Sequence, residues 1–348
     1  PFSNINIEKE TSDILIEDLN RDGLNDLYTV NGSVEYSRES SNIKDDVFFG
    51  LEDQRIEKSE ASLSFQQGCC AAVIKKPSGK SKLLLVAPRI NGSVLGLPTK
   101  MSVYQFDKNV IKSNMTLSKS FEDVGMVTDI IVGNVNGDSE PEIIIASQFR
   151  PLSIYKLNDG NTADKLTNTG LDGFAGNWND LVLEDVDNDG DNDIIALNLG
   201  INNRLYNMSN GELYLFTNDF DSNGDIDNVY CYKNGDKFYP IHLREEMIMQ
   251  MPAVKKKVLK YADYAEASLT DIFGEAIVKR SLISNINEFN SGIFYNDNGS
   301  FTFVPLPKEV QYSEQKAVWC GDINNDGWND LIIGGNQYKA QPHIGMNA

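Results

Sequence analysis

The chain has 348 residues, 41% of them hydrophobic, which is enough for a sizeable core and excludes a disordered protein. Its 31 basic and 51 acidic residues give a net charge of −20, which argues against a nucleic-acid partner because such proteins concentrate Lys and Arg. No apolar run approaches the roughly 20 residues that a membrane-spanning helix needs, so we expect a soluble or peripheral protein. The first residues do not read as a signal peptide, and we expect a chain trimmed at one or both ends.

A nine-residue phrase recurs five times along the chain. The copies are DLNRDGLND (18–26, loop 1), NVNGDSEPE (134–142, loop 2), DVDNDGDND (185–193, loop 3), DFDSNGDID (219–227, loop 4) and DINNDGWND (322–330, loop 5). Positions 1, 3, 5 and 9 carry side-chain oxygens in every copy. Loop 2 is the weakest copy, because its positions 1 and 3 are asparagines and its glycine is displaced to Gly137.

Oxygen donors at this spacing can surround one hard cation, with the backbone carbonyl of position 7 and the carboxylate of position 9 completing the shell. Glycine at position 6 permits the sharp turn, and an all-oxygen set without His or Cys favours Ca²⁺. We expect about four calcium ions, or five if loop 2 also binds one. The predicted ligands are Asp18, Asn20, Asp22, Leu24, Asp26; Asn134, Asn136, Asp138, Glu140, Glu142; Asp185, Asp187, Asp189, Asp191, Asp193; Asp219, Asp221, Asn223, Asp225, Asp227; and Asp322, Asn324, Asp326, Trp328, Asp330.

The flanks of the loops distinguish them from EF-hands. An EF-hand needs glutamate at position 12, and the four strong copies hold Thr29, Ala196, Tyr230 and Ile333 there. Short β-branched and aromatic runs precede and follow each loop, which predicts strands on both sides. The alternative is that Asp, Asn and Gly merely form turns; the matched donor positions in four copies favour metal binding.

The spacing of the loops predicts a β-propeller. A degenerate copy at 74–86, with Gly79 at position 6 but Lys76 and Lys82 in place of acids, would bind no cation; a lysine could supply the positive charge there, or the segment is a solvated turn. Starts at 18, 74, 134 and 185 leave 51 to 60 residues per unit, which suits a four-stranded antiparallel blade. The 34-residue step between loops 3 and 4 indicates a trimmed unit or one that shares strands with its neighbour.

The long step between loops 4 and 5 contains a helical insertion at 242–280, where the apolar period changes to about 3.6 and Pro252 separates two helices. It holds the cluster Lys255, Lys256, Lys257 and Lys260, which is either a solvated helix face or an anchor for an anionic partner. The segment 292–307, with an Asn-Gly pair, predicts a hairpin.

Cysteine and histidine give little indication of catalysis. The adjacent Cys69 and Cys70 are strand residues or a vicinal disulfide, and Cys231 and Cys320 lie in apolar strand-like runs. The two histidines, His242 and His343, stand without a G-x-S-x-G nucleophile motif, and we expect no catalytic residue.

The strand, acidic loop and strand units resemble the FG-GAP or VCBS repeats of integrin α-subunit propellers and of secreted bacterial proteins. More narrowly, the order of GMVTDIIVGNVNGD, WNDLVLEDVDNDGDNDIIALNLGIN and NNDGWNDLIIGGN is similar to bacterial relatives of the cartilage acidic protein family, which often carry an UnbV-type tail. The resemblance implies one all-β domain over 1–348, a β-propeller of seven four-stranded blades. It also implies calcium and an exported or cell-surface location, outer-membrane-associated in a Gram-negative bacterium and in some relatives beside nutrient-uptake lipoproteins.

Besides a purely structural domain of a larger protein, two functions therefore remain open. The first is a protein- or glycan-binding scaffold subunit in a surface complex, for which we expect contacts at 198–207 and at the lysine cluster. The second is a calcium-dependent polysaccharide lyase or another carbohydrate-active enzyme.

Overall fold

The structure is a computed structural model that describes residues 9–32, 40–52, 55–59, 68–75, 82–91, 94–106, 116–138, 140–158 and 162–335, with the backbone alone for 116–120. It is mostly β, in several antiparallel sheets, as expected. Within the described residues, no helix is long and apolar enough to cross a membrane.

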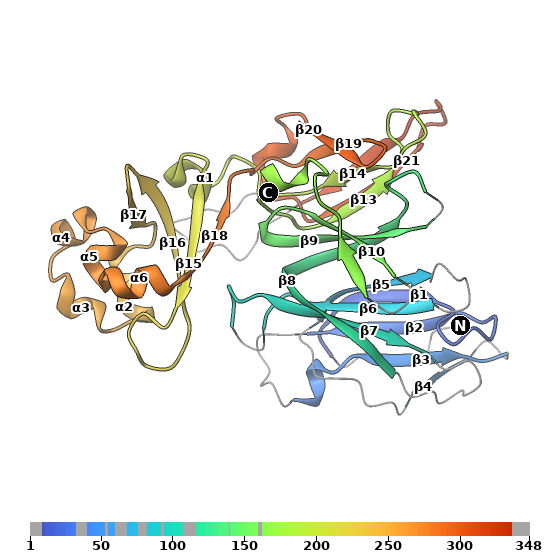
Figure 1. Ribbon diagram of the computed structural model, residues 1–348, viewed down its shortest axis with the longest axis horizontal. Coiled ribbons are helices and arrows are strands. Elements are labelled where there is room, and N and C mark those ends of the chain that lie inside the picture. Colours follow the sequence, from blue (N-terminus) through green and yellow to red (C-terminus); the bar gives the residue numbers. More distant parts are fainter. Residues whose placement is uncertain are drawn as a thin grey trace.

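The sheets follow one another along the chain (Figure 1). Sheet 1 has β1 (Thr11–Glu17), β2 (Asp26–Asn31), β3 (Asp46–Gly50) and β4 (Ile56–Lys58); sheet 2 has β5 (Gly68–Lys75), β6 (Lys82–Pro88), β7 (Thr99–Gln105) and the first part of β8 (Thr116–Gly133). Sheet 3 has the rest of β8, β9 (Glu142–Arg150), β10 (Ser153–Leu157) and β11 (Ala163–Lys165), with β12 (Gly176–Asn177) on β9. Sheet 4 has β13 (Leu181–Glu184), β14 (Asp193–Ala196), β19 (Gly292–Asp297) and β20 (Ser300–Pro305), and sheet 5 has β21 (Ala317–Gly321) and β22 (Asp330–Gly334). Single 3-10 turns lie at Ser41–Ile43, Leu171–Gly173 and Val310–Tyr312.

A further unit, which we call the inserted unit, interrupts sheet 4 between β14 and β19. Its own sheet has β15 (Leu213–Asn218), β16 (Asp227–Asn234), β17 (Lys237–Pro240) and β18 (Leu282–Ile286), preceded by α1 (Arg204–Ser209). Five short helices cover it: α2 (Arg244–Gln250), α3 (Val254–Lys257), α4 (Tyr261–Glu266), α5 (Leu269–Phe273) and α6 (Glu275–Arg280).

The inserted unit corrects one expectation about the repeat. Loop 4 joins β15 to β16, so the 34-residue step marks neither a trimmed unit nor shared strands, but the start of a separate four-stranded sheet. The predicted strands on both sides of all five loops are confirmed. The segment 242–280 is helical as predicted and Pro252 lies between two helices, α2 and α3, but the segment forms five short helices instead of two. The predicted hairpin is β19–β20, whose turn residues Asn298 and Gly299 both have positive φ, as a type I′ turn requires.

Neighbouring sheets share their cores, which explains the unbroken apolar runs. In β6, Leu83 and Leu85 face sheet 3 while Leu84 and Val86 face sheet 1. Since both faces of such a strand are buried, alternation with polar residues disappears. A third core joins sheets 3 and 4 around Trp178. The helices of the inserted unit bury a separate core against its sheet.

A repeated pair of polar residues, which we call the clip, joins the first strand of one sheet to the next sheet. The first residue of the pair donates a side-chain hydrogen bond to a backbone carbonyl of the next sheet. The aspartate that follows it accepts the backbone N–H of the residue three positions after that carbonyl. The clips are Ser12 and Asp13 to Gly68 O and Ala71 N (3.2 and 3.0 Å), Thr128 and Asp129 to Trp178 O and Leu181 N (2.6 and 2.8 Å), and Asn179 and Asp180 to Gln315 O and Val318 N (2.8 and 2.7 Å).

In sheet 2 a cysteine takes part in the contact with the next sheet. Cys69 lies at a bulge of β5 and its thiol donates to Thr128 O at 3.4 Å. Cys69 and Cys70 are both free thiols within β5. They are therefore strand residues and do not form the vicinal disulfide that was the alternative.

The clip predicts a loss of stability on a conservative change. Thr128→Val keeps the shape of the side chain but leaves Trp178 O without its 2.6 Å donor, and we expect unfolding free energy to fall by about 1–3 kcal/mol. Thr302→Val, at an exposed position of β20, makes the same change outside the clip and should be close to neutral. Chemical denaturation measures both; equal effects would contradict the role of the clip.

Candidate metal sites

Loops 1, 3, 4 and 5 have one backbone conformation. Position 4 is left-handed in each, with φ of 67°, 60°, 61° and 61° at Arg21, Asn188, Ser222 and Asn325. The glycine at position 6 has φ between 90° and 100° in all four, a region that side chains rarely adopt. Four separate segments therefore fold in the same way because their turn residues permit it.

The aspartate at position 1 holds each of these loops closed. Its Oδ2 accepts the N–H of the glycine at position 6 at 2.9–3.1 Å. The side chain at position 5 accepts the N–H of position 7 at 2.7–2.9 Å. Asp and Asn are suited to such local bonds, and the bonds orient the side-chain oxygens of positions 1 and 5.

The carboxylate at position 9 is the buried member of the set. In all five loops it accepts the N–H of position 2 at 2.8–3.2 Å. Asp26, Glu142, Asp193 and Asp227 are each at most 5% exposed. Burial raises the pKa of Asp26 to about 6, and burial followed by neighbouring carboxylates raises the pKa of Asp193 and of Asp227. An ionised carboxylate in such a place needs a positive partner.

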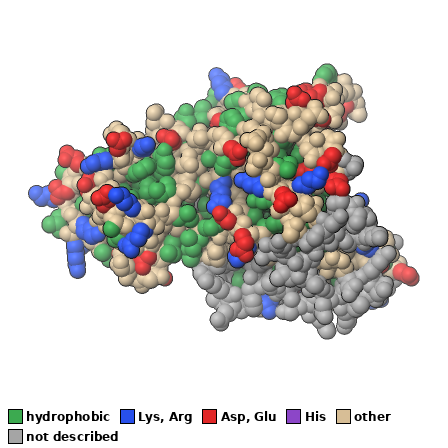
Figure 2. Space-filling model, in the orientation of Figure 1, with side chains coloured by type: hydrophobic (Ala, Val, Ile, Leu, Met, Phe, Trp, Pro, Cys, Tyr) green, Lys and Arg blue, Asp and Glu red, His purple; other side chains and the backbone are tan. Residues whose placement is uncertain are grey.

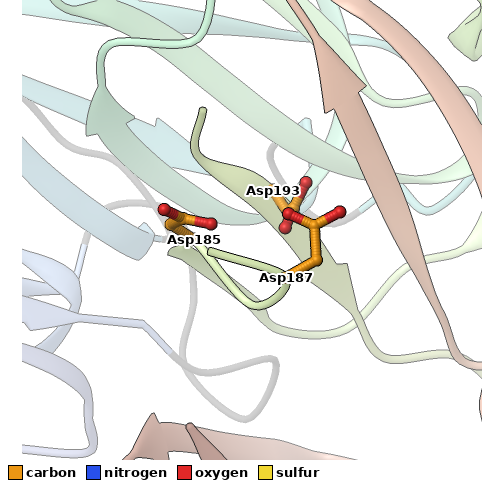
Figure 3. Close-up of side chains that lie close together, drawn as sticks. All are labelled: Asp185, Asp187 and Asp193. Atoms are coloured by element: carbon orange, nitrogen blue, oxygen red, sulfur yellow. The ribbon is translucent and has the colours of Figure 1, made fainter. Parts of the chain in front are cut away.

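Loops 3 and 4 bring three carboxylates together. Asp185, Asp187 and Asp193 each offer an oxygen within 4.8 Å of the others, and Figure 3 shows them gathered at the loop between β13 and β14. Loop 4 repeats the set with Asp219, Asp221 and Asp227. Asp221 Oδ1 is buried and has no hydrogen-bond partner in the part of the chain that the structure describes. The donor set and this orphaned oxygen fit a hard divalent cation.

Loops 1 and 5 have asparagine at position 3. The Nδ2 of Asn20 donates to Asp22 at 2.9 Å and that of Asn324 donates to Asp326 at 3.0 Å, while their Oδ1 atoms accept the N–H of position 5. Lys82 of sheet 2 contacts loop 1, since its ammonium pairs with Glu17 and donates to Asp18 O at 3.1 Å. This lysine, predicted as part of a degenerate loop, therefore serves the neighbouring sheet.

In two cases the asparagine at position 8 bonds a loop to the loop of the neighbouring sheet. Asn192 of loop 3 donates to Asn134 O of loop 2 at 3.0 Å, and Asn329 of loop 5 donates to Asp185 O of loop 3 at 3.2 Å. Loop 4 has Ile226 at this position, in keeping with its place in the inserted unit. In loops 3 and 5, the asparagine at position 8 thus bonds to the loop of the preceding sheet, and the aspartate at position 9 is the predicted metal ligand.

The structure places the predicted partner contacts on the inserted unit and its connection to sheet 4. Lys255, Lys256, Lys257 and Lys260 are all exposed, and acidic side chains lie among the basic ones on the face drawn in Figure 2. Segment 198–207 is mostly half-buried, with Asn202 and Asn207 exposed. Asn198 at its start is fully buried and its Nδ2 donates to Glu288 O at 2.9 Å.

His242 has its contacts in the inserted unit, with Tyr230. His242 accepts the N–H of Tyr230 through Nε2 at 3.2 Å and stacks on that ring, and burial lowers its pKa. His343 lies outside the described residues. These contacts give His242 a structural role.

Comparisons with known proteins add little. No family model matches the sequence, and no curated protein matches it. Among solved structures, MPT-1, a GDP-Man-dependent mannosyltransferase from Leishmania mexicana, is similar with a TM-score of 0.27 and 14% identity, over 60% of this chain and 59% of that chain. A similarity of this size supports no conclusion about fold or function, so any proposal rests on the geometry of the loops.

The shared backbone predicts a cost for any side chain at position 6. Gly190→Ala introduces a Cβ at φ of 100° although no atom lies within 4 Å of it, and we expect a loss of about 1–3 kcal/mol from backbone strain. Gly173→Ala is the matched control, since its Cβ is equally uncrowded and its φ is not positive. If denaturation shows equal stability for the two variants, the loop does not depend on this conformation.

Proposed function

We propose that the chain is a calcium-binding β-propeller that acts as a protein- or glycan-binding scaffold at a cell surface or in secreted form. The observation that carries the calcium assignment is the convergence of three carboxylates in loops 3 and 4 on one preorganised backbone. Calcium prefers six to eight oxygen ligands from flexible acidic loops. In this proposal positions 1, 3, 5, 7 and 9 of loops 1, 3, 4 and 5 hold the ions, which supply the positive charge that the buried carboxylates need.

The propeller assignment rests on how the sheets succeed one another. The first strands β1, β5, β8, β13 and β21 are consecutive neighbours, and three of the four junctions between them use the same clip. Loops 1, 2, 3 and 5 each connect the first strand of a sheet to the second. In a propeller, such loops lie on one face of the ring.

The scaffold role is supported by the surface of the inserted unit. The lysine cluster is flanked by Leu259 and Tyr261, which are 72% and 65% exposed. Exposed apolar side chains beside a basic cluster suit a partner that carries negative charge. An acidic glycan or an acidic protein surface has this chemistry.

Calcium should stabilise the folded chain more than magnesium. At a free concentration of 100 times Kd, one site contributes about 2.7 kcal/mol. Thermal unfolding in calcium, in magnesium and after chelation, with metal content by mass spectrometry, should give a calcium-specific rise in Tm and about four ions per chain. Asp187→Ala and Asp221→Ala remove the position 3 oxygen and should each lower the ion count by one, whereas Asp172→Ala, at an exposed aspartate outside the loops, should not. A chain that binds fewer than two ions would refute the calcium assignment.

The lysine cluster should control retention on an acidic ligand. Deleting the helices would expose their core with Met247, Leu269 and Phe273, so a charge change is the better test. We expect Lys255, Lys256, Lys257 and Lys260 changed together to Gln to keep the Tm and to weaken binding to an immobilised polyuronate at least tenfold at low salt. Lys279→Gln is the control for loss of an exposed lysine on the same unit. Unchanged retention would place the contact elsewhere.

A further inference from the structure

Loop 2 differs from the other four loops, because a lysine ammonium lies where a bound ion would contact its side chains. Lys156 on β10 reaches the loop and its Nζ lies 2.5 Å from Asp138 Oδ2 and 3.7 Å from Glu140 Oε2. These are the side chains of positions 5 and 7. We infer that the Lys156 ammonium is the resident cation of loop 2, and that this loop takes no calcium. The inference rests on the proposed calcium function of the other loops.

The register of sheet 3 brings the lysine to this point. Lys156 lies directly opposite Glu142, the position 9 residue, in the pairing of β10 with β9. In sheets 1 and 4 the third strand offers no lysine there. Because Leu27 lies opposite Phe48 and Ile194 opposite Phe294, the residues facing Asp26 and Asp193 are Phe49 and Tyr295. Sheet 3 therefore differs from the other two at the one position from which a third-strand side chain can enter the loop.

The loop's own amides complete the argument. Asn136 Nδ2 donates to Glu142 Oε1 at 2.7 Å and to Asp138 Oδ2 at 3.1 Å, and Asn134 Nδ2 contacts Asp138 O. The bond from position 3 to position 5 also occurs in loops 1 and 5, through Asn20 and Asn324. Loop 2 differs in the bond from Asn136 to the position 9 carboxylate and in having an amide, Asn134, at position 1, where loops 1, 3, 4 and 5 have an aspartate without a donor. The buried carboxylate of Glu142 is stabilised by hydrogen bonds from Val135 N and Asn136 Nδ2 in place of a metal.

The electrostatics of the loop agree with this geometry. The Lys156 ammonium holds the pKa of Asp138 below its ordinary value, and Asp138 raises the pKa of Lys156. At position 9 burial raises the pKa of Glu142, as it raises the pKa of Asp193 and of Asp227; Lys156 opposes the rise at Glu142, while the charged neighbours of Asp193 and Asp227 are carboxylates. Lys156 offsets one of the three carboxylates of loop 2, whereas no lysine pairs with loops 3 and 4 in the part of the chain that the structure describes.

The test removes the lysine and counts ions. Lys156→Met keeps the length of the side chain without its charge, Lys156→Arg keeps a cation, and Lys279→Met removes a lysine from an exposed pair with Glu275 (2.7 Å) outside the loops. In chelator, we expect Lys156→Met to lower Tm by a few degrees (about 2 °C or more), and Lys279→Met to leave it unchanged. In calcium, Lys156→Met should regain the lost Tm and hold one ion more than wild type, while Lys156→Arg should hold the wild-type number.

Two results would overturn the inference. One is the same Tm for Lys156→Met and Lys279→Met in chelator. The other is a lower ion count for Asp138→Ala than for wild type, because loop 2 would then already hold a metal. Should wild type bind no calcium at all, the proposed function fails, and the Tm comparison in chelator still decides the role of Lys156.

Discussion

The buried carboxylate at position 9 is the constraint on which the rest of the structure depends. It stands where a loop enters the second strand of a sheet, accepts the N–H of position 2, and is nearly inaccessible in four of the five loops. Burying an isolated charge is costly, so every loop needs a positive partner or a set of donors for it. The acidic composition of the chain is a consequence, since each loop adds further oxygens around this one.

The loops are also part of the joints between sheets. The clip fixes the first strand of one sheet against the next, and the asparagine at position 8 fixes one loop against another. These contacts are short and polar, and they lie beside shared apolar cores. A cation that rigidifies one loop therefore acts on the junction with the neighbouring sheet, because the position 1 residue that would bind it also supplies the carbonyl that the next sheet contacts.

The sequence predicted the parts of the fold that depend on local chemistry. Donor spacing and turn glycines predicted the five loops, and the flanking apolar runs predicted their strands, because both act over a few residues. Three features depended on tertiary context and were not predictable. The sheet of loop 4 is inserted between β14 and β19, which no local pattern near Ala196 or Gly292 indicates. Ser12, Thr128 and Asn179 are ordinary polar residues until their partners in the next sheet are known. Lys156 reaches loop 2 through strand register, 14 residues beyond Glu142.

The distribution of lysines divides the described sheets into two kinds. Sheets 2 and 3 are joined by the continuous strand β8 and share one core. Lys156 on β10 pairs with loop 2 of sheet 3, and Lys82 at the start of β6 contacts loop 1 of sheet 1. No lysine pairs with loops 3, 4 and 5 within the described residues. Under the proposed function, the positive charge at these three loops would come from a bound ion. Since a carboxylate cluster without its cation is self-repelling, metal loss should loosen sheets 4 and 5 and the inserted unit before it loosens the β8-linked pair. The order of unfolding in chelator would thus follow from which loops contain their own cation.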